Sequence, residues 1–276
     1  MDKTDYLDPS CPFDVSDYQS VPQIRAVDQK VDVLKILEKV DSYYASLRYR
    51  DAERLLEESL ELSREYGDKA GELGILSELI GVYRKSGEKK KGIDAIYSAF
   101  KLIEDLGLEG TATAGTVWVN GGTTLRAFNM STDALPYFYM ASRAYSANIP
   151  ADDYRFAGLY NNLGSCLEAL NKNEEALKYY ELALAVVKQN PLTEIDAAIT
   201  WINMAEVYDK MEPRDEEKIE ECVNNCMAIF NNPKIERDEY YSFHAKGCAG
   251  GLKSLGYFRD ARELKKRAED IDHALS

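Results

Sequence analysis

The chain has 276 residues, of which 45% are hydrophobic and 30% charged, and its net charge is −14. This acidity argues against binding to a nucleic-acid backbone or an anionic membrane surface, because both attract basic faces. No apolar run approaches the roughly 18 residues that a membrane span needs, and the acidic N-terminus lacks the apolar segment of a signal peptide. Five cysteines at irregular spacing indicate reduced thiols in a cytoplasmic protein and not a disulfide framework.

Residues 1–28 differ from the rest of the chain because they combine prolines and aspartates with well-separated aromatic residues. Prolines at this density disfavour a helix, so the segment predicts an extended arm. One alternative is a disordered tail. Another is an arm whose aromatic side chains pack on the first repeat or occupy a groove, in the same chain or in a second copy. The residues concerned are Tyr6, Pro9, Pro12, Phe13, Tyr18 and Pro22.

From residue 29 onward one phrase recurs: a turn residue, a short linker, and then a small residue that opens an amphipathic helix. The first copy reads LRYRDAERLLEESLEL and the fourth reads NKNEEALKYYELALAV. The six copies are separated by steps of 40, 42, 42, 43 and 42 residues, a regularity that chance does not produce. Their anchor residues, small in all copies but the fifth, are Ala52, Gly92, Ala134, Ala176, Ile219 and Ala261.

The anchor begins a regular face on each of these helices. A bulky residue follows four positions later and another small one seven positions later, so all three share one side of the helix. A small anchor lets two antiparallel helices approach closely, and the paired glycines Gly121–Gly122 and Gly250–Gly251 are interpreted as close-packing positions too. The sixth copy has Lys265 at the bulky position, which suits a terminal helix whose outer face meets water.

The same periodicity, with glycine, asparagine or proline at the turns, predicts twelve helices. No linker rich in glycine, serine and proline interrupts them, so residues 29–276 are expected to form a single superhelical domain. The predicted fold class is all-α, an α-solenoid of six helix–turn–helix repeats. The expected helices span residues 30–47, 51–66, 69–86, 89–106, 111–128, 131–147, 152–170, 173–189, 193–210, 215–230, 236–254 and 258–273.

The fourth repeat reads YNNLGSCLEALNKNEEALKYYELALAVV, with a large residue, then Leu-Gly, then alanine and an aromatic residue at regular spacing. This order resembles the tetratricopeptide repeat (TPR). The repeats here exceed the typical length of about 34 residues, as in the kinesin-light-chain-like variant of that superfamily. The resemblance implies a right-handed solenoid whose first helices line a concave groove that binds a protein or peptide.

A series of asparagines occupies one groove-lining position implied by this resemblance. In similar repeats an asparagine there holds a peptide backbone, whose C=O and N–H groups match the donors and acceptor of an amide. Asn120, Asn162 and Asn203 take this position in the third to fifth repeats, and Asn161 adjoins it. The alternative is that these side chains bond neighbouring helices of the solenoid. The remaining repeats depart from the pattern with Glu38, Glu78 and Gly247.

Charged residues near the ends of the first helices divide the expected groove into two parts. Arg84 and Arg126 make the second and third repeats basic, and arginine can hold a carboxylate through two hydrogen bonds. Glu168, Glu206 and Asp209 make the fourth and fifth repeats acidic. The alternative is that these charges are solvated or paired with one another, which contributes little to stability.

Catalytic chemistry has little support in the sequence. His244 and Cys248 are four residues apart and would share a helix face, but no orienting group or oxyanion site accompanies them. Cys222 and Cys226 lack a second pair of ligands at the spacing of a zinc site. We therefore expect no enzymatic activity, no catalytic or metal-binding residues and no cofactor.

Together these features predict a cytoplasmic adaptor or scaffold that binds a protein or peptide in the groove, with neither nucleic acid nor membrane among its partners. An alternative is a peptide-responsive cytoplasmic regulator resembling bacterial quorum-sensing proteins with such repeats. Only about 30 residues precede the repeats, too few for a helix-turn-helix domain, so regulation would act through the solenoid pitch. A further alternative is a homo-oligomeric scaffold joined through the N-terminal arm. The fold does not identify the partner.

Overall fold

The computed structural model describes residues 29–45, 48–189 and 194–275, and the arm predicted for residues 1–28 lies outside this part of the chain. The described residues form twelve α-helices and no strand, which confirms the predicted all-α class. None of these helices has the length and apolar character needed to cross a membrane. The described residues divide between Ile149 and Pro150 into two compact units, so the expected single domain stays a prediction.

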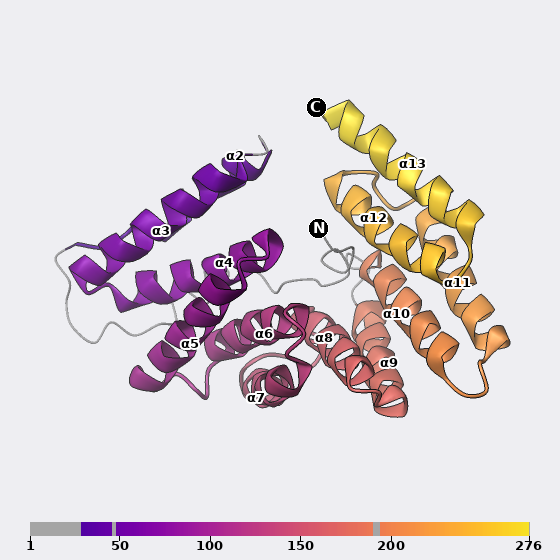
Figure 1. The fold of residues 1–276 in the computed structure, drawn as a ribbon, viewed down its shortest axis with the longest axis horizontal. Helices are drawn as coiled ribbons and strands as arrows, with labels where there is room; N and C mark the ends of the chain where they lie inside the picture. The colour runs from indigo at the N-terminus through magenta and orange to yellow at the C-terminus, as the bar shows by residue number, and fades with distance from the viewer. Residues whose placement is uncertain (1–28, 46–47, 190–193, 276) are drawn as a thin grey trace. The chain divides into compact units, whose positions relative to one another are not determined.

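Each unit contains three helix–turn–helix repeats (Figure 1). The N-terminal unit consists of α2 (Val33–Ala45), α3 (Tyr49–Tyr66), α4 (Lys69–Ser86), α5 (Lys89–Asp105), α6 (Ala112–Ala127) and α7 (Ser131–Asn148). The C-terminal unit consists of α8 (Arg155–Ala169), α9 (Asn173–Gln189), α10 (Asp196–Lys210), α11 (Glu216–Asn231), α12 (Glu239–Ser254) and α13 (Phe258–Leu275). All of these helices begin and end within about three residues of their predicted bounds.

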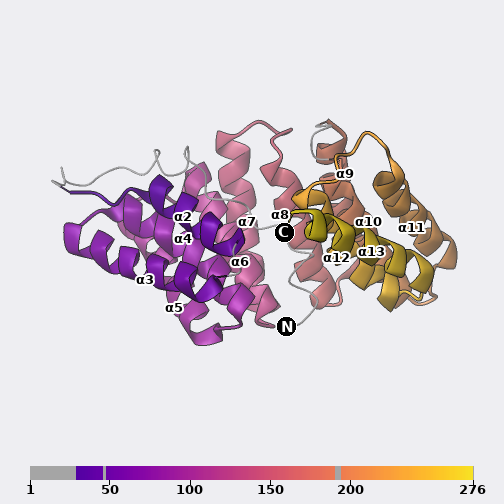
Figure 2. The ribbon, with the colours of Figure 1, turned by 90° about the horizontal axis from the view of Figure 1, so that it is seen from above.

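Within each unit the helices stack in the order of the sequence, as both views show (Figures 1 and 2). The first helix of a repeat packs against the second helix of the same repeat, for example α6 against α7 and α12 against α13. It also contacts the first helix of the next repeat, as α4 contacts α6 and α10 contacts α12. This nearest-neighbour packing confirms the predicted stacking of helix–turn–helix repeats.

The anchor residues lie where the two helices of a repeat approach each other. An added Cβ at Gly92 of α5 would lie 3.4 Å from Cβ of Tyr83 on α4 of the same repeat, and 2.8 Å from the ring of Phe128, which follows α6 in the next repeat. Lys265 remains largely exposed on α13, as expected for a terminal helix. Close approach therefore explains why most anchors are small. The anchors without any exposed surface are Ala52, Ala134, Ala176 and Ile219.

Polar groups fix the turn between α3 and α4. Gly67 ends α3 with a φ of 70°, a left-handed conformation that glycine adopts without steric cost. Asp68 then caps α4, because its Oδ1 accepts a hydrogen bond from the Gly71 N–H at 3.1 Å. Its Oδ2 accepts another from the Val31 N–H at 3.1 Å. One buried carboxylate therefore fixes both the start of α4 and the segment that leads into α2.

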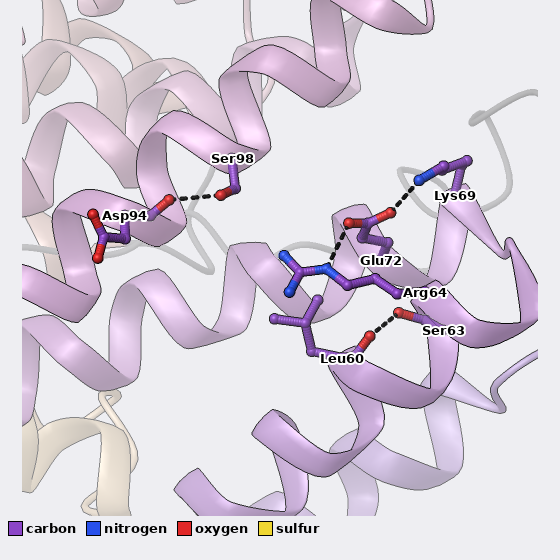
Figure 3. A network of polar contacts seen from close by, with 7 residues as sticks. All are labelled: Leu60, Ser63, Arg64, Lys69, Glu72, Asp94 and Ser98. Atoms are coloured by element: carbon purple, nitrogen blue, oxygen red, sulfur yellow. Dashed lines mark hydrogen bonds and ion pairs between the residues drawn. The ribbon is translucent and has the colours of Figure 1, made fainter.

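A second carboxylate joins α4 to α3 (Figure 3). Glu72 accepts from Arg64 Nε at 2.9 Å and from Lys69 Nζ at 2.7 Å. In the same view Ser63 donates to the Leu60 carbonyl oxygen within α3, at 2.7 Å. The first repeat is thus connected to the second by charged groups as well as by apolar packing.

Several glycines of the first helices are required by neighbouring side chains. A Cβ at Gly164 of α8 would lie 2.5 Å from Cε1 of Tyr180, which reaches over from α9. Nothing lies within 4 Å of a Cβ added at Gly250, so its interpretation as a close-packing position is wrong. The other members of the two glycine pairs are closely packed as predicted, and these are Gly121, Gly122 and Gly251.

Two glycines of α8 provide a matched test of this packing. Gly164→Ala should lower the free energy of unfolding by about 1–3 kcal/mol, because the new methyl group displaces the Tyr180 ring. Gly158→Ala should raise it by about 1 kcal/mol, because nothing lies within 4 Å of the new Cβ and alanine is the better helix former. Urea unfolding monitored by circular dichroism measures the free energy of unfolding of both variants. Equal changes in the two variants would contradict the close contact between Gly164 and Tyr180.

Candidate functional site

Successive first helices contact one another along a row of side chains that we call the first-helix face. In the N-terminal unit an example is the hydrogen bond between Asn120 and Ser77, which are 43 residues apart. In the C-terminal unit Lys210 pairs with Glu168, 42 residues away. Residues one repeat apart thus become neighbours. In the C-terminal unit the face includes Asn161, Ser165 and Glu168 of α8, Asn203, Glu206 and Lys210 of α10, and Ser254 of α12.

The predicted asparagine of the N-terminal unit joins two first helices. Asn120 of α6 donates through Nδ2 to Ser77 Oγ of α4 at 3.1 Å, and only 7% of the residue is exposed. Its Oδ1 is buried and has no hydrogen-bond partner in the described part of the chain. The amide therefore uses its donor inside the protein, as the structural alternative expects, and its buried acceptor has no partner among the described residues.

The predicted asparagines of the C-terminal unit are also buried. Asn162 has no exposed surface and donates to the Gly158 carbonyl oxygen within α8 at 3.0 Å. Asn161 is 3% exposed and Asn203 is 4% exposed. Among the described residues, no group accepts from Asn203 Nδ2 or donates to Asn161 Oδ1. Buried polar atoms without a partner are rare in folded proteins, so these two atoms call for a water or a ligand group.

The predicted basic patch is less accessible than the sequence suggested. Arg84 of α4 is only 5% exposed, and Arg126 of α6 is partly buried. A carboxylate of a partner would therefore reach Arg126 more easily than Arg84. Their role as carboxylate anchors stays a prediction.

A carboxyl group with a perturbed pKa lies on α4, the helix that carries Arg84. Burial raises the pKa of Glu78 on α4 to about 7, and the negative charge of Asp41 on α2 adds to the shift, while Lys85 opposes it. In the sequence Glu78 stood out only as a departure from the asparagine pattern. Its burial depends on neighbouring helices, which a single-helix pattern does not reveal.

Two of the three predicted acidic residues come together in the C-terminal unit. Glu168 accepts from Lys210 Nζ at 2.5 Å and from the Tyr180 hydroxyl at 3.2 Å. Glu206 accepts from Ser254 Oγ at 3.1 Å, and burial together with the charge of Glu168 raises its pKa. The third predicted acid pairs elsewhere: Asp209 accepts from Arg214 Nε at 2.6 Å. This cluster therefore centres on Glu168 and Glu206.

Lys210 and Ser254 are members of this cluster that the sequence reasoning missed. Lys210 directly follows Asp209, and its separation of 42 residues from Glu168 equals one repeat. A separation of one repeat therefore predicts that Lys210 and Glu168 are neighbours on successive first helices. Ser254 lies 48 residues from its partner Glu206, which departs from the repeat length and offers no such signal.

His244 and Cys248 do not form a nucleophilic pair with each other. The His244 ring lies within α12 with Nδ1 2.8 Å from the Tyr240 carbonyl oxygen and Nε2 2.9 Å from Asp196 Oδ1. The Cys248 thiol interacts with Cys226, and complete burial raises its pKa well above the usual value. A buried thiol that stays protonated is a poor nucleophile.

Comparison with known proteins relates this arrangement to one superfamily. The family model described as tetratricopeptide repeat matches residues 159–194. A search of curated proteins finds no match. The crystal structure of BtubC (BKLC) from P. vanneervenii is similar at 25% sequence identity and a TM-score of 0.64, covering 74% of this chain and 83% of that one.

A second solved structure is similar to this chain in its fold but has low sequence identity. The putative kinesin light chain from Podosopora anserina, with nearly identical TPR-like repeats, has 13% identity and a TM-score of 0.52. The match covers 71% of this chain and 92% of that one, and a single-substitution variant of that protein aligns at a TM-score of 0.53. The predicted resemblance is therefore confirmed: residues 159–194 match the tetratricopeptide repeat, and the fold is that of TPR-like helical repeats. Repeats of this kind generally mediate protein–protein interactions and typically act as non-catalytic scaffolds.

The pKa of Glu78 makes a specific prediction about stability and pH. The carboxyl ionises near pH 4.5 when exposed and near pH 7 in the folded protein. Its contribution to the free energy of unfolding therefore becomes more unfavourable as the pH rises from 4.5 to 7, and it is constant at higher pH. Glu78→Gln should remove this penalty and raise the free energy of unfolding at pH 8 by about 1–3 kcal/mol, with little effect at pH 4.

Urea unfolding at pH 4, 6 and 8 measures this difference. The matched control is Glu38→Gln, at the equivalent position of the first repeat, where the side chain is exposed on α2. A Glu78→Gln variant whose stability follows the same pH dependence as wild type would contradict the prediction.

Proposed function

We propose that the chain is a cytoplasmic adaptor or scaffold that binds an extended segment of a partner protein along its first-helix face. One observation carries the proposal: buried amides of this face keep polar atoms without hydrogen-bond partners among the described residues, namely Asn120 Oδ1, Asn161 Oδ1 and Asn203 Nδ2. Each such atom costs about 1–3 kcal/mol when it stays unsatisfied, which a ligand would recover.

The two atoms of the C-terminal unit match the backbone of an extended peptide. Asn161 Oδ1 offers an acceptor for a peptide N–H, and Asn203 Nδ2 offers a donor for a peptide C=O. They belong to α8 and α10, which contact each other as first helices of successive repeats. An extended segment presents alternating N–H and C=O groups along its length, so it can satisfy both.

The general role of TPR-like repeats in protein–protein interaction supports a protein partner. The described cysteines are free and buried, which agrees with a reducing compartment. The alternatives of a peptide-responsive regulator and of a homo-oligomer joined through the arm stay open. The arm itself lies outside the described residues.

Selection from a displayed library of random decapeptides tests the proposal directly. Wild type should retain a set of peptides, and the double variant Asn161→Ala, Asn203→Ala should bind those peptides at least about tenfold more weakly, because two hydrogen bonds to the peptide backbone are lost. Fluorescence polarisation with the synthetic peptides measures the affinities.

The matched control is Asn224→Ala, an exposed asparagine on α11. This variant should bind every selected peptide as wild type does. The proposal fails if the double variant keeps full affinity for all of them while its circular dichroism remains that of the folded protein.

A further inference from the structure

The charges around Glu206 do not balance within the C-terminal unit. Glu168 and Glu206 lie on successive first helices, and Lys210 is the cation close to both carboxylates among the described residues. The Lys210 ammonium bonds Glu168 at 2.5 Å. In the described part of the chain Glu206 has a neutral partner, the Ser254 hydroxyl at 3.1 Å, which also lies 2.8 Å from the Gly251 carbonyl oxygen. When both carboxyl groups are ionised, their two negative charges share the one positive charge of Lys210.

Neighbouring residues do not remove this imbalance. Asp209 is bonded to Arg214 at 2.6 Å, and Arg214 also bonds Glu216 at 2.5 Å, so this guanidinium already serves two carboxylates. The Glu168 side chain is only 11% exposed, whereas the Lys210 side chain is 57% exposed. A carboxylate in such a setting is stabilised by a cation that hydrogen-bonds to it.

A second observation points to a ligand at the same place. Asn203 precedes Glu206 by one helical turn on α10, and Asn161 precedes Glu168 by two turns on α8, so the amides and the carboxylates share the same faces. These are the amides whose Nδ2 and Oδ1 have no partner among the described residues, although each residue is more than nine-tenths buried. Two buried amide atoms without a partner among the described residues thus lie on the same helix faces as Glu168 and Glu206.

We propose that Glu206, together with Glu168, forms a subsite for the side chain of a lysine or arginine in the bound segment. The inference rests on the proposed function, because the amides of Asn161 and Asn203 would hold the backbone that presents this side chain. The ammonium or guanidinium group of the ligand side chain donates a hydrogen bond to Glu206 and neutralises its negative charge, because Lys210 is bonded to Glu168. The partner is therefore a protein whose bound segment carries a basic residue at one fixed position.

Synthetic decapeptides test this subsite. Peptides selected on wild type are made with blocked termini, so that only side chains carry positive charge. The lysine of each peptide is replaced by norleucine, or its arginine by citrulline, at one position at a time. At one position the replacement should weaken binding to wild type by about tenfold or more, as expected for a charge-assisted hydrogen bond.

In the Glu206→Gln variant the same replacement in the peptide should change the binding affinity by less than about twofold. Glutamine keeps the shape and can still accept from Ser254, so the variant tests charge and not folding. Lys210→Met should act in the opposite direction and strengthen binding of the basic peptides, because it removes the competing ammonium. Glu220→Gln, an exposed carboxylate of α11, is the matched control and should behave as wild type does.

The outcomes separate this inference from the proposed function. If wild type selects peptides but no basic position matters, or if the same position matters equally in Glu206→Gln, the subsite is refuted while peptide binding stands. If wild type retains no peptide from the library, the proposed function fails and the subsite fails with it.

Discussion

The close approach of two antiparallel helices within each repeat is the constraint on which the rest of the structure depends. At the anchor positions most side chains are no larger than alanine, and a Cβ at Gly92 of α5 would lie 3.4 Å from Cβ of Tyr83 on α4. The same lack of space recurs at Gly164, which lies under the ring of Tyr180. Because the helices lie so close, aromatic side chains of the second helices reach across to the first helices. The Tyr180 hydroxyl can thereby bond both Ser165 and Glu168.

Because the helix–turn–helix repeats stack on one another, residues that are one repeat apart in the sequence become neighbours. The contacts between first helices are therefore set by the repeat length: Asn120 meets Ser77 in one unit, and Lys210 meets Glu168 in the other. Polar side chains on these helices are pressed between neighbours and lose their contact with water. Burial then decides their chemistry, raising the pKa of Glu78 to about 7 and leaving atoms of several amides without partners.

These properties direct attention to binding more than to reaction chemistry. The residues with nucleophilic or basic potential are engaged in packing: Cys248 interacts with Cys226 and His244 lies against Asp196 and Tyr240. The first-helix face, in contrast, holds amide atoms without a hydrogen-bond partner among the described residues, and a carboxylate, Glu206, whose described hydrogen-bond donor is the neutral Ser254 hydroxyl. These groups are the basis of the proposal that the first helices hold a peptide backbone and select one basic side chain of it.

The sequence by itself determined the helices, their order and the repeat, because apolar periodicity and turn residues act locally and because the anchors recur at nearly constant steps. The repeat positions of Asn161, Asn203, Glu168 and Glu206 predict that they lie in the groove, and this role stays a prediction. Only the tertiary structure decided how those residues are used: that Arg84 is buried, that Asp209 pairs with Arg214, that Gly250 faces open space, and that Glu206 lacks a cation of its own. The reason is physical. Burial, charge pairing and free volume depend on what the neighbouring repeat places opposite each residue, and the pattern of a single helix carries no information about that neighbour.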